Sequence, residues 1–463
     1  MPTTKGDFFD VIVVGAGVVG CAVFRALAVG GARVLLVERG ADILSGASKA
    51  NSALLHTGYD APADSLELSC VRAGYAEYLE IRERLNLPLV ETSAILVAWN
   101  DAQRDRLPAI VTAARANGVA DVAVIDEAEI RRREPHLGPG IMGGVSIPGE
   151  HVIDPWSAPL AYVRQGLAHG GEVIRHCRID GGEFDGAAWT LNTTKGPIRS
   201  AVIINCAGLF GDVIEAIHRP SPFHIRPRKG QFVVLDKPAA QLVNAIILPV
   251  PDERTKGVLL ARTAFGNLLV GPTAEEQEDR EDTSTDGDVL RRLIEQGERM
   301  VPGLAAHAIT ATYAGLRPAT EFKDYQIEAS AERNWITVGG IRSTGLTGAL
   351  GIAAYVRDLF QGHFGGLSDD PPRHWPTVPN LCQSEPRPYQ EPDRGELVCQ
   401  CELVTRKEID AALTGALPAE DLGGLKRRTR AMMGRCQGFY CSARVAELAD
   451  GRFTVPLARK VAS

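Results

Sequence analysis

The order of apolar, polar and glycine-rich stretches at the start of the chain predicts a strand, a helix and a second strand. Phe9 to Val14 is rich in β-branched residues, as a buried strand is. A glycine-rich turn follows, and then about a dozen mostly apolar residues with the composition of a packed helix. A second apolar strand ends at Glu38. Two strands joined by a helix in this way form a parallel βαβ unit.

The same kind of pattern predicts further strands later in the chain. Residues 202–205 form a short apolar strand that runs into small residues, and another strand ends at Gly340 before a small-residue helix that should begin near Thr347. Between them, GQFVVLD (230–236) and GNLLVGP (266–272) have the alternation and β-branching of strands. The fold class is therefore α/β, with room for more than one domain.

Composition and charge narrow the possible partners. The 463 residues are 45% hydrophobic and 23% charged, which is ordinary for globular proteins, and the net charge of −7 argues against nucleic-acid binding. A small molecule is the expected partner. No stretch approaches the roughly 18 to 20 apolar residues of a membrane span, because glycines and Arg25 interrupt the apolar start. We therefore expect a cytoplasmic protein, with peripheral contact to a membrane left open.

The glycines of the first turn predict a nucleotide site. Gly15 permits the tight turn, Gly17 lets a pyrophosphate approach the backbone at the helix N-terminus, and Gly20 lets helix and strand pack closely. Glu38 follows Gly20 by eighteen residues at the end of the second strand, where a carboxylate can accept hydrogen bonds from an adenosine ribose. The alternative is a glycine turn that binds nothing.

The segments that follow the nucleotide unit resemble those of a known family. The stretch GASKANSALLHTGYD (46–60) looks like the flavin-proximal segment of the D-amino-acid oxidase superfamily, in the branch with FAD-dependent glycerol-3-phosphate dehydrogenases and oxidases and L-2-hydroxyglutarate dehydrogenases. Residues 143–171, 201–214 and 335–353 resemble later segments of the same family. Together the similarity covers about residues 8 to 365.

The resemblance implies a Rossmann-type FAD domain interleaved with an α+β substrate domain built on an antiparallel sheet. The FAD-binding parts are expected at 8–90, 146–215 and 326–365, and the substrate domain at 91–145 and 216–325. The cofactor-binding residues that this implies are Gly15, Gly17, Gly20, Glu38, Arg39, Ser48, Asn51, Ser52, Ala207, Gly208, Gly340, Gly345, Leu346 and Thr347. The N-terminal amides of the last helix can stabilise the charge of a reduced flavin ring.

The resemblance also implies an anion-binding pocket with a base. It brings Lys229, Arg317 and Arg342 toward the substrate, and an arginine fork matches a carboxylate or phosphate. His56 is the expected catalytic base, because an alcohol gives up hydride only as its hydroxyl proton leaves and an imidazole accepts that proton at neutral pH. We expect Arg317 to be catalytic as well as substrate-binding. The alternatives are a structural His56 and a helical pair between Arg317 and Glu321.

The expected activity is oxidation of a small anionic alcohol, with glycerol 3-phosphate or a related polyol phosphate as the first candidate. One departure weakens the phosphate interpretation: anaerobic glycerol-3-phosphate dehydrogenases carry an extra arginine where this chain has Tyr59 and Asp60. A 2-hydroxy-acid or amino-acid dehydrogenase is the alternative within this chemistry. From another class, the chain is an electron-transfer subunit whose partner holds the substrate site.

The end of the chain carries four of the nine cysteines. A proline-rich stretch, 366–396, predicts a linker, and Cys399-x-Cys401 and Cys436-x4-Cys441 follow it, thirty-four residues apart. Disulfides suit an oxidising compartment and zinc prefers Cys-x2-Cys pairs, whereas a [2Fe-2S] cluster tolerates other spacings.

The tail, 397–450, resembles the small helical domain named for the bacterioferritin-associated ferredoxin, which implies a [2Fe-2S] cluster on these four thiolates. Such a cluster passes flavin electrons singly to an acceptor, either a protein partner or a quinone. The basic run from Lys426 to Arg430 would offset the cluster's charge, dock a partner or form a solvated helix face.

Overall fold

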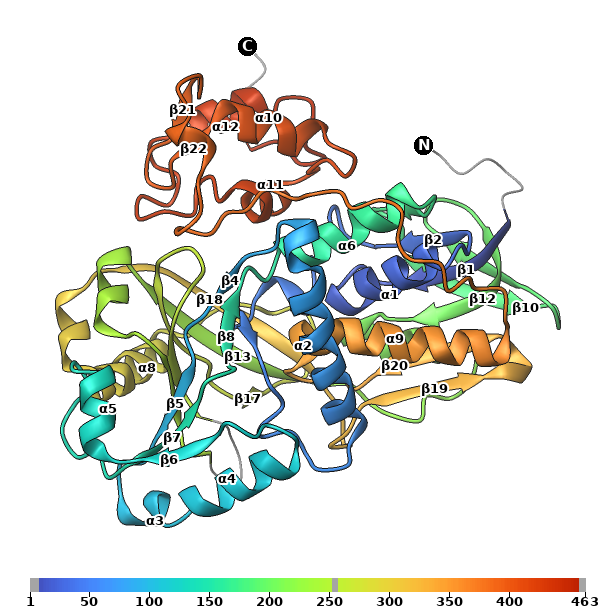
Figure 1. The fold of residues 1–463 in the computed structure, drawn as a ribbon. Coiled ribbons are helices and arrows are strands. Elements are labelled where there is room, and N and C mark those ends of the chain that lie inside the picture. Colours follow the sequence, from blue (N-terminus) through green and yellow to red (C-terminus); the bar gives the residue numbers. More distant parts are fainter. Residues whose placement is uncertain (1–7, 252–256, 458–463) are drawn as a thin grey trace.

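The computed structural model describes residues 8–251 and 257–457. Figure 1 shows two sheet-based domains side by side and a small, mostly helical domain from the end of the chain above them. Among the residues that the structure describes, none of the helices has the length and apolar character needed to cross a bilayer.

The first domain is built on an eight-stranded sheet. Its path runs β10-β11-β12-β1-β2-β9, and β20 also pairs with β12 and carries β19. The strands are β1 (Phe8–Val14), β2 (Val34–Val37), β9 (Glu172–Ile174), β10 (Ile179–Phe184), β11 (Trp189–Thr193), β12 (Ile198–Asn205), β19 (Gln326–Ser330) and β20 (Trp335–Gly339). β9, β2, β1, β12 and β20 are parallel to their neighbours in this series, as the βαβ pattern predicts, while β10, β11 and β19 pair antiparallel at the edges.

Four helices cover this sheet and share its main core. They are α1 (Val18–Val29), α2 (Leu66–Leu85), α6 (Ser157–Ala168) and α9 (Gly345–His363). Helix α1 packs against α6 and α9, and α9 packs against α2 (Figure 1). Ser65 caps α2 by accepting the N–H of Leu68, and Asn86 ends the helix in the left-handed conformation. Helix α9 begins at Gly345, a little earlier than the sequence pattern predicts.

The second domain is built on a nine-stranded sheet in the order β17-β13-β16-β15-β14-β5-β7-β6, with β18 on β13. Its strands are β5 (Ala94–Val97), β6 (Ala123–Ile125), β7 (Gly144–Ile147), β13 (Arg226–Leu235), β14 (Ile246–Pro249), β15 (Leu259–Arg262), β16 (Leu268–Gly271), β17 (Glu275–Glu276) and β18 (Ile309–Ala319). Its helices are α3 (Asp101–Arg104), α4 (Leu107–Ala116), α5 (Glu127–Arg133) and α8 (Gly287–Met300). The short helix α7 (Gly211–Glu215) precedes β13.

Two details of this sheet differ from expectation. The sheet is antiparallel except where β5 and β14 run parallel, which is possible because they come from the two separate parts of the domain. Strand β7 pairs with β5 and β6, so the domain boundary expected at 145/146 falls inside a strand of this sheet. A small third sheet consists of β3 (Leu54–Leu55), β8 (His151–Ile153) and β4 (Leu89–Val90), with β8 in the middle.

The C-terminal domain has its own apolar core. It consists of β21 (Leu397–Cys399), β22 (Val404–Thr405), α10 (Arg406–Thr414), α11 (Leu422–Thr429) and α12 (Ser442–Leu448). Thr405 and Glu408 form a capping box at the start of α10, in which each side chain accepts the other residue's backbone N–H. The domain is therefore small and mostly helical, as its sequence suggests.

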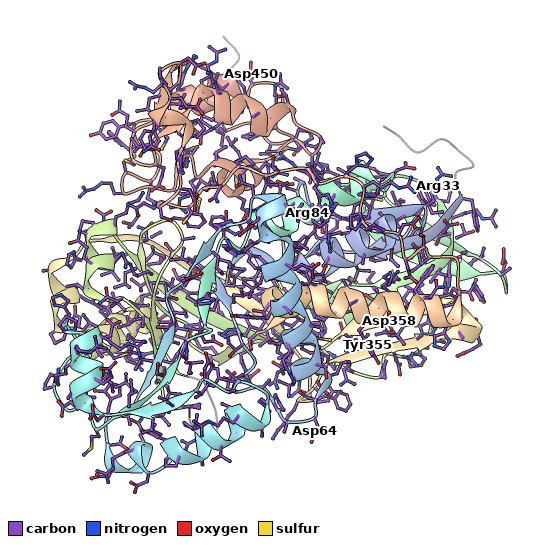
Figure 2. The ribbon with its side chains drawn as sticks, in the orientation of Figure 1. Arg33, Asp64, Arg84, Tyr355, Asp358 and Asp450 are labelled. Atoms are coloured by element: carbon purple, nitrogen blue, oxygen red, sulfur yellow. The ribbon has the colours of Figure 1, made fainter. Side chains whose placement is uncertain are left out.

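The proline-rich segment 366–396 is packed along the body and does not hang free. It contains only the short 3-10 helix η6 (Pro388–Gln390). Ser368 N–H donates to Gly30 O at 2.8 Å, and Gln383 N–H donates to Ala264 O at 2.9 Å. Arg84, which is labelled in Figure 2 at the end of α2, lies 3.6 Å from the ring centre of Trp375. The segment thus ties both sheet domains to the tail, because its backbone bonds to each of them.

Buried charges fix the C-terminal domain to the first domain. Asp42 is completely buried and accepts a two-pronged hydrogen bond from the guanidinium of Arg428, whose Nη2 lies 2.8 Å from Oδ1. Arg427 donates to Ile43 O at 3.1 Å, and Arg175 lies 3.6 Å from Asp42. The basic run of the tail is therefore not a solvated helix face, because its arginines bind a carboxylate of the same chain.

Replacing Asp42 with Asn should strongly destabilise this contact, because it leaves buried arginines without their carboxylate. We expect the free energy of unfolding to fall by about 3 to 5 kcal/mol, measured by denaturant unfolding of the full chain. The matched control is Asp180→Asn, which breaks an exposed pair with Arg178 and should change the value by less than about 1 kcal/mol. Equal effects of the two changes would show that the Asp42 contact contributes nothing special.

Candidate active site

The glycine turn after β1 is as close-packed as a nucleotide loop requires. Gly15 has φ of +100°, and a Cβ on it would lie 2.6 Å from the carbonyl oxygen of Cys206. A Cβ on Gly20 would lie 1.8 Å from the carbonyl oxygen of Gly15. Gly17 is the N-cap of helix α1 and has no side chain to cap it, while Ser48 accepts the N–H of Val18 at 3.0 Å. A helix N-terminus approached only by small groups fits the pyrophosphate of a dinucleotide.

Glu38 is held rigidly beside this turn. Its Oε2 accepts the N–H of Ala16 at 2.9 Å, and its Oε1 accepts the N–H of Gly40 at 2.7 Å. Burial raises the pKa of the Glu38 carboxyl, and these two hydrogen bonds partly oppose that effect. The carboxylate thus sits at the carboxyl end of β2, next to the glycine turn, where a ribose would lie.

Arg39, also expected at the cofactor, makes contacts that join the two sheet domains. Its guanidinium lies 3.9 Å from the ring centre of Phe210 and 2.9 Å from the carboxylate of Glu281. Its role toward a cofactor stays a prediction.

The segment expected beside the flavin lies against β18. The Asn51 side chain shapes its turn, since its Nδ2 donates to Ser48 O at 3.1 Å and its Oδ1 accepts the N–H of Ala53 at 2.8 Å. Tyr313 of β18 donates its hydroxyl to Asn51 O at 2.7 Å, and a Cβ on Gly315 would lie 2.4 Å from Ala50 O. Ser52 is half-buried in the same segment. The contacts bring one face of the β13–β18 pair to the segment that carries His56.

The later cofactor segments end at the same edge of the first sheet. Ala207 and Gly208 follow β12, and Gly208 has φ of +54°. Gly340 follows β20 with φ of +69°, and Gly345 and Leu346 open helix α9. Since the carboxyl ends of parallel strands meet at one edge, these residues lie on the same side of the sheet as Gly15 and Glu38.

His56 is paired with a buried carboxylate that the sequence pattern did not reveal. Its Nδ1 lies 2.8 Å from Oε2 of Glu150, whose side chain is completely buried. The His56 backbone N–H donates to Thr347 Oγ1 at 3.0 Å, and that hydroxyl donates to Leu54 O at 3.2 Å. About a fifth of the imidazole is exposed, with 22% of its side-chain surface accessible. His56 is therefore oriented by both its ring and its backbone.

Arg317 is a half-buried cation that forms no ion pair within the described part of the chain. Its Nη2 donates to Thr273 O at 3.1 Å, while Glu276 pairs with Arg228 instead. Burial lowers the pKa of Arg317 to about 10, helped by the neighbouring charge of Arg228, so the guanidinium stays protonated at neutral pH. Arg317 lies in β18, so the alternative of a helical pair with Glu321 is wrong.

The other two expected anion-binding residues lie apart from Arg317 in different ways. Lys229 is in register with Leu316, whereas Arg317 is in register with Arg228, so Lys229 and Arg317 leave opposite faces of the sheet. The Lys229 Nζ donates to Asp282 at 2.9 Å. Arg342 is half-buried in the loop between β20 and α9. The substrate roles of Lys229 and Arg342 stay predictions.

The four tail cysteines come together in two pairs. Cys399 contacts Cys441, and Cys401 contacts Cys436, through their thiol groups. In residues 8–251 and 257–457, no three His, Cys, Asp or Glu side chains converge on the position of a single metal ion. Four neighbouring thiols from two separate segments are instead the donor set of a [2Fe-2S] cluster.

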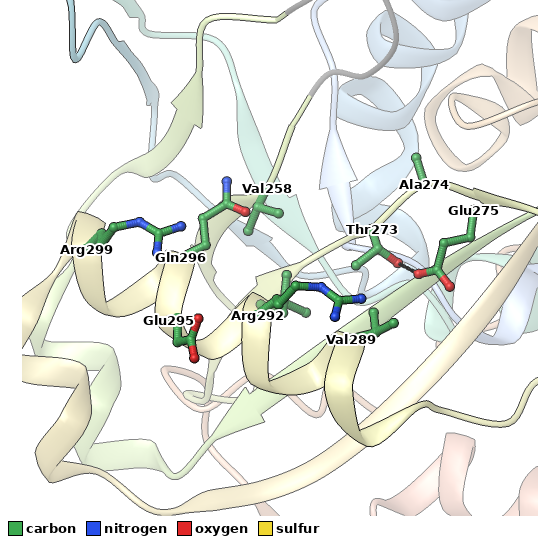
Figure 3. Close-up of a pocket in the computed structure, with 10 residues that line it drawn as sticks. Val258, Thr273, Ala274, Glu275, Val289, Arg292, Glu295, Gln296 and Arg299 are labelled. Atoms are coloured by element: carbon green, nitrogen blue, oxygen red, sulfur yellow. Dashed lines mark hydrogen bonds between the residues drawn. The ribbon is translucent and has the colours of Figure 1, made fainter.

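A surface hollow is lined by other residues. Figure 3 shows it between α8 and residues 273–275, with a volume of about 640 Å³. Its lining includes Glu275, Arg292 and Arg299, and none of the expected site residues. The lining also includes Thr273, whose carbonyl oxygen accepts the hydrogen bond from Arg317.

Comparison with known proteins agrees with this site. Residues 10–359 match the family model described as FAD dependent oxidoreductase, and residues 397–450 match the BFD-like [2Fe-2S] binding domain. A glycerol 3-phosphate dehydrogenase of Caloramator mitchellensis is 31% identical over 95% of this chain and 93% of its own. One subunit of the anaerobic glycerol-3-phosphate dehydrogenase of Escherichia coli K12 is 26% identical over 98% of this chain and 90% of its own.

Among solved structures, the FAD-bound L-alpha-glycerophosphate oxidase of Mycoplasma pneumoniae superposes with a TM-score of 0.74 and 26% identity, over 81% of this chain and 99% of the other. The glycine turn and Glu38 agree with the match to the FAD dependent oxidoreductase model. The four tail thiols agree with the match to the [2Fe-2S] binding domain. The chain therefore belongs to the FAD-dependent oxidoreductase family and ends in a BFD-like [2Fe-2S] binding domain.

Proposed function

We propose that this enzyme oxidises glycerol 3-phosphate, or a closely related polyol phosphate, and passes the electrons through its [2Fe-2S] domain to an acceptor. The observation that carries the proposal is the half-buried, protonated Arg317, which forms no ion pair within the described residues and lies on a strand that contacts the His56 segment. A half-buried cation of this kind is stabilised by an anionic ligand. The relatives named above act on glycerol 3-phosphate or glycerophosphate, which supports the same substrate here.

The residues divide the chemistry between them. Arg317, with Arg342, would hold the anionic group of the substrate, and His56 would accept the hydroxyl proton. Gly15, Gly17, Ser48 and Glu38 would hold the dinucleotide part of FAD, which when bound accepts the hydride. Because Nδ1 of His56 faces Glu150, Nε2 is the ring nitrogen that would take the proton.

The turn at Tyr59 bears on whether the anionic group of the substrate is a phosphate or a carboxylate. Tyr59 and Asp60 stand where the resemblance implies an extra arginine in anaerobic glycerol-3-phosphate dehydrogenases, and Tyr59 is buried, with 6% of its surface exposed. Asn117 holds this turn by donating to the carbonyl oxygens of Gly58 and Ala61. A 2-hydroxy acid or amino acid, whose carboxylate Arg317 would also bind, is therefore the second candidate.

The acceptor and the location of the enzyme follow from the tail and the thiols. We propose a one-electron acceptor, either a protein or a quinone, that takes electrons from the cluster. A cytoplasmic location is supported by the nine cysteines, all of which are free thiols. If the substrate site belonged to a partner subunit instead, the isolated chain would bind FAD without being reduced by any candidate substrate.

Anaerobic addition of glycerol 3-phosphate should bleach the bound FAD, and 2-hydroxy acids and amino acids should bleach it far more slowly. Replacing Arg317 with Ala should raise the half-saturating concentration by about 10- to 100-fold, since a hydrogen bond to a charged group is lost. Arg291→Ala, at an exposed position on α8, is the control and should leave the concentration unchanged. Bleaching by a 2-hydroxy acid in preference to glycerol 3-phosphate would move the enzyme to the second candidate.

His56→Asn should retain FAD and slow flavin reduction by about 10²- to 10⁴-fold, which is the usual contribution of a positioned base. Stopped-flow absorbance at saturating substrate measures the rate. An unchanged rate would assign His56 a structural role only.

Cys436→Ser should abolish the cluster and leave substrate bleaching of the flavin nearly intact, because the cysteines belong to a separate core from the FAD site. Iron and sulfide analysis and the electron-spin signal of the reduced protein measure the cluster. Cys382→Ser is the control, since this thiol is buried outside the tail domain and should not affect iron content. Zinc without iron in anaerobically prepared wild-type protein would contradict the relay.

A further inference from the structure

Glu150 lies where the pairing of two short strands brings it to His56. In the antiparallel pair of β3 and β8, Leu55 is opposite His151, so the next residues, His56 and Glu150, face each other. One carboxylate oxygen, Oε2, lies 2.8 Å from His56 Nδ1. The other, Oε1, accepts the Thr57 N–H at 2.6 Å and the Thr57 hydroxyl at 2.8 Å. Both oxygens of this fully buried carboxylate are therefore engaged by the His56–Thr57 segment.

In the described part of the chain, no arginine or lysine forms an ion pair with Glu150, and its one ionic partner there is His56. The other titratable groups around it are Tyr59, Tyr75 and His151. Burial raises the pKa of Tyr59 well above its ordinary value and that of Tyr75 to about 12, with the charge of Glu150 adding to both effects. Burial lowers the pKa of His151, against the opposing charges of Glu91 and Glu150.

These shifts leave Tyr59, Tyr75 and His151 neutral near pH 7. Asp60 contributes a further negative charge at Tyr59. The imidazole of His56 is thus the group whose charge the buried carboxylate can stabilise most directly at neutral pH.

We propose that Glu150 is a positioning residue of the reaction, which holds His56 with its ring hydrogen on Nδ1 and stabilises the imidazolium formed when Nε2 accepts the substrate proton. The inference rests on the proposed function, in which His56 is the base. Its chemistry is that of a carboxylate that orients a histidine without itself touching substrate.

Glu150 supports the step in which the substrate alcohol becomes a carbonyl compound. The substrate O–H bond breaks, and the proton bonds to Nε2 of His56. The electron pair of that bond becomes the second bond of the new carbonyl group. The hydrogen on the carbon that carries this oxygen would leave as a hydride to the FAD that the site would hold, so the substrate would lose two electrons and the FAD would gain them. The imidazolium then carries one positive charge opposite the negative charge of Glu150.

The amide variant Glu150→Gln tests this assignment sharply because Thr57 decides how the amide lies. The two Thr57 donors require the amide oxygen at the Oε1 position, which turns the NH₂ group toward His56 Nδ1. A neutral His56 must then accept at Nδ1 and carry its hydrogen on Nε2, which disables it as a base. We expect flavin reduction to slow by about 10²- to 10⁴-fold while FAD is retained.

A readout independent of activity is the tautomer of His56 in the holoenzyme. ¹⁵N-histidine labelling identifies the hydrogen-bearing ring nitrogen, and the His56 signal is assigned by its loss in His56→Asn. The wild type should show the neutral form with hydrogen on Nδ1, and Glu150→Gln should show it on Nε2. Since this observation on the wild type needs no variant of Glu150 to fold, hydrogen on Nε2 in the wild type would by itself overturn the proposal.

Two further variants separate positioning from packing. Thr57→Val removes the hydroxyl that binds Glu150 but leaves the contact with His56, and it should change the rate by less than about 10-fold. The double variant His56→Asn, Glu150→Gln should be no slower than His56→Asn alone, because Glu150 acts through His56. Additive losses would show that Glu150 acts independently and would overturn the inference. If His56→Asn itself does not slow reduction, the proposed base fails, whereas a slow His56→Asn with a fast Glu150→Gln refutes only the role of Glu150.

Discussion

The parallel pairing of β1 with β2 and β12 is the constraint on which the rest of the molecule depends. Val14 is in register with Val37 on one side and with Asn205 on the other. The turns after all three strands therefore open at the same edge, and the one after β1 approaches the one after β12 so closely that only glycine fits at position 15. Every segment expected to hold the cofactor begins from this edge or packs against it, which is why residues hundreds of positions apart form one site.

Local pattern was sufficient to predict the parts of the fold that local chemistry determines. The βαβ unit, the strand before Gly340 and the cysteine pairs were recognisable because glycine, β-branched residues and thiols have narrow uses. The sequence pattern did not predict on which face of the second sheet each candidate residue lies. Lys229 and Arg317 lie on opposite faces of the sheet because of the β13–β18 register, and no pattern within either strand determines that register.

Glu150 and Asp42 show a second limit of sequence reasoning. Each is a single acidic residue in an unremarkable turn, and each becomes important only because a distant segment supplies its partner: His56 for one, Arg428 for the other. For the proline-rich segment 366–396, the sequence pattern predicted too little structure. Its composition is typical of a free linker, but hydrogen bonds to Gly30 and Ala264 hold it along the body. Tertiary contacts decide such cases, and they are not encoded by spacing along the chain.

The placement of the tail domain suggests how one chain can join two-electron and one-electron chemistry. Its helix α11 is fixed to the first domain at Asp42, four residues beyond Glu38, while Arg430 lies 4.0 Å from the ring centre of Phe265 in the second domain. Glu402 and Arg435, which adjoin cluster cysteines, lie near Lys237 and Asp236 of that same second domain. The tail domain therefore contacts both sheet domains. Electron transfer weakens steeply with distance, and these buried and bridging charges hold the cluster domain against both sheet domains.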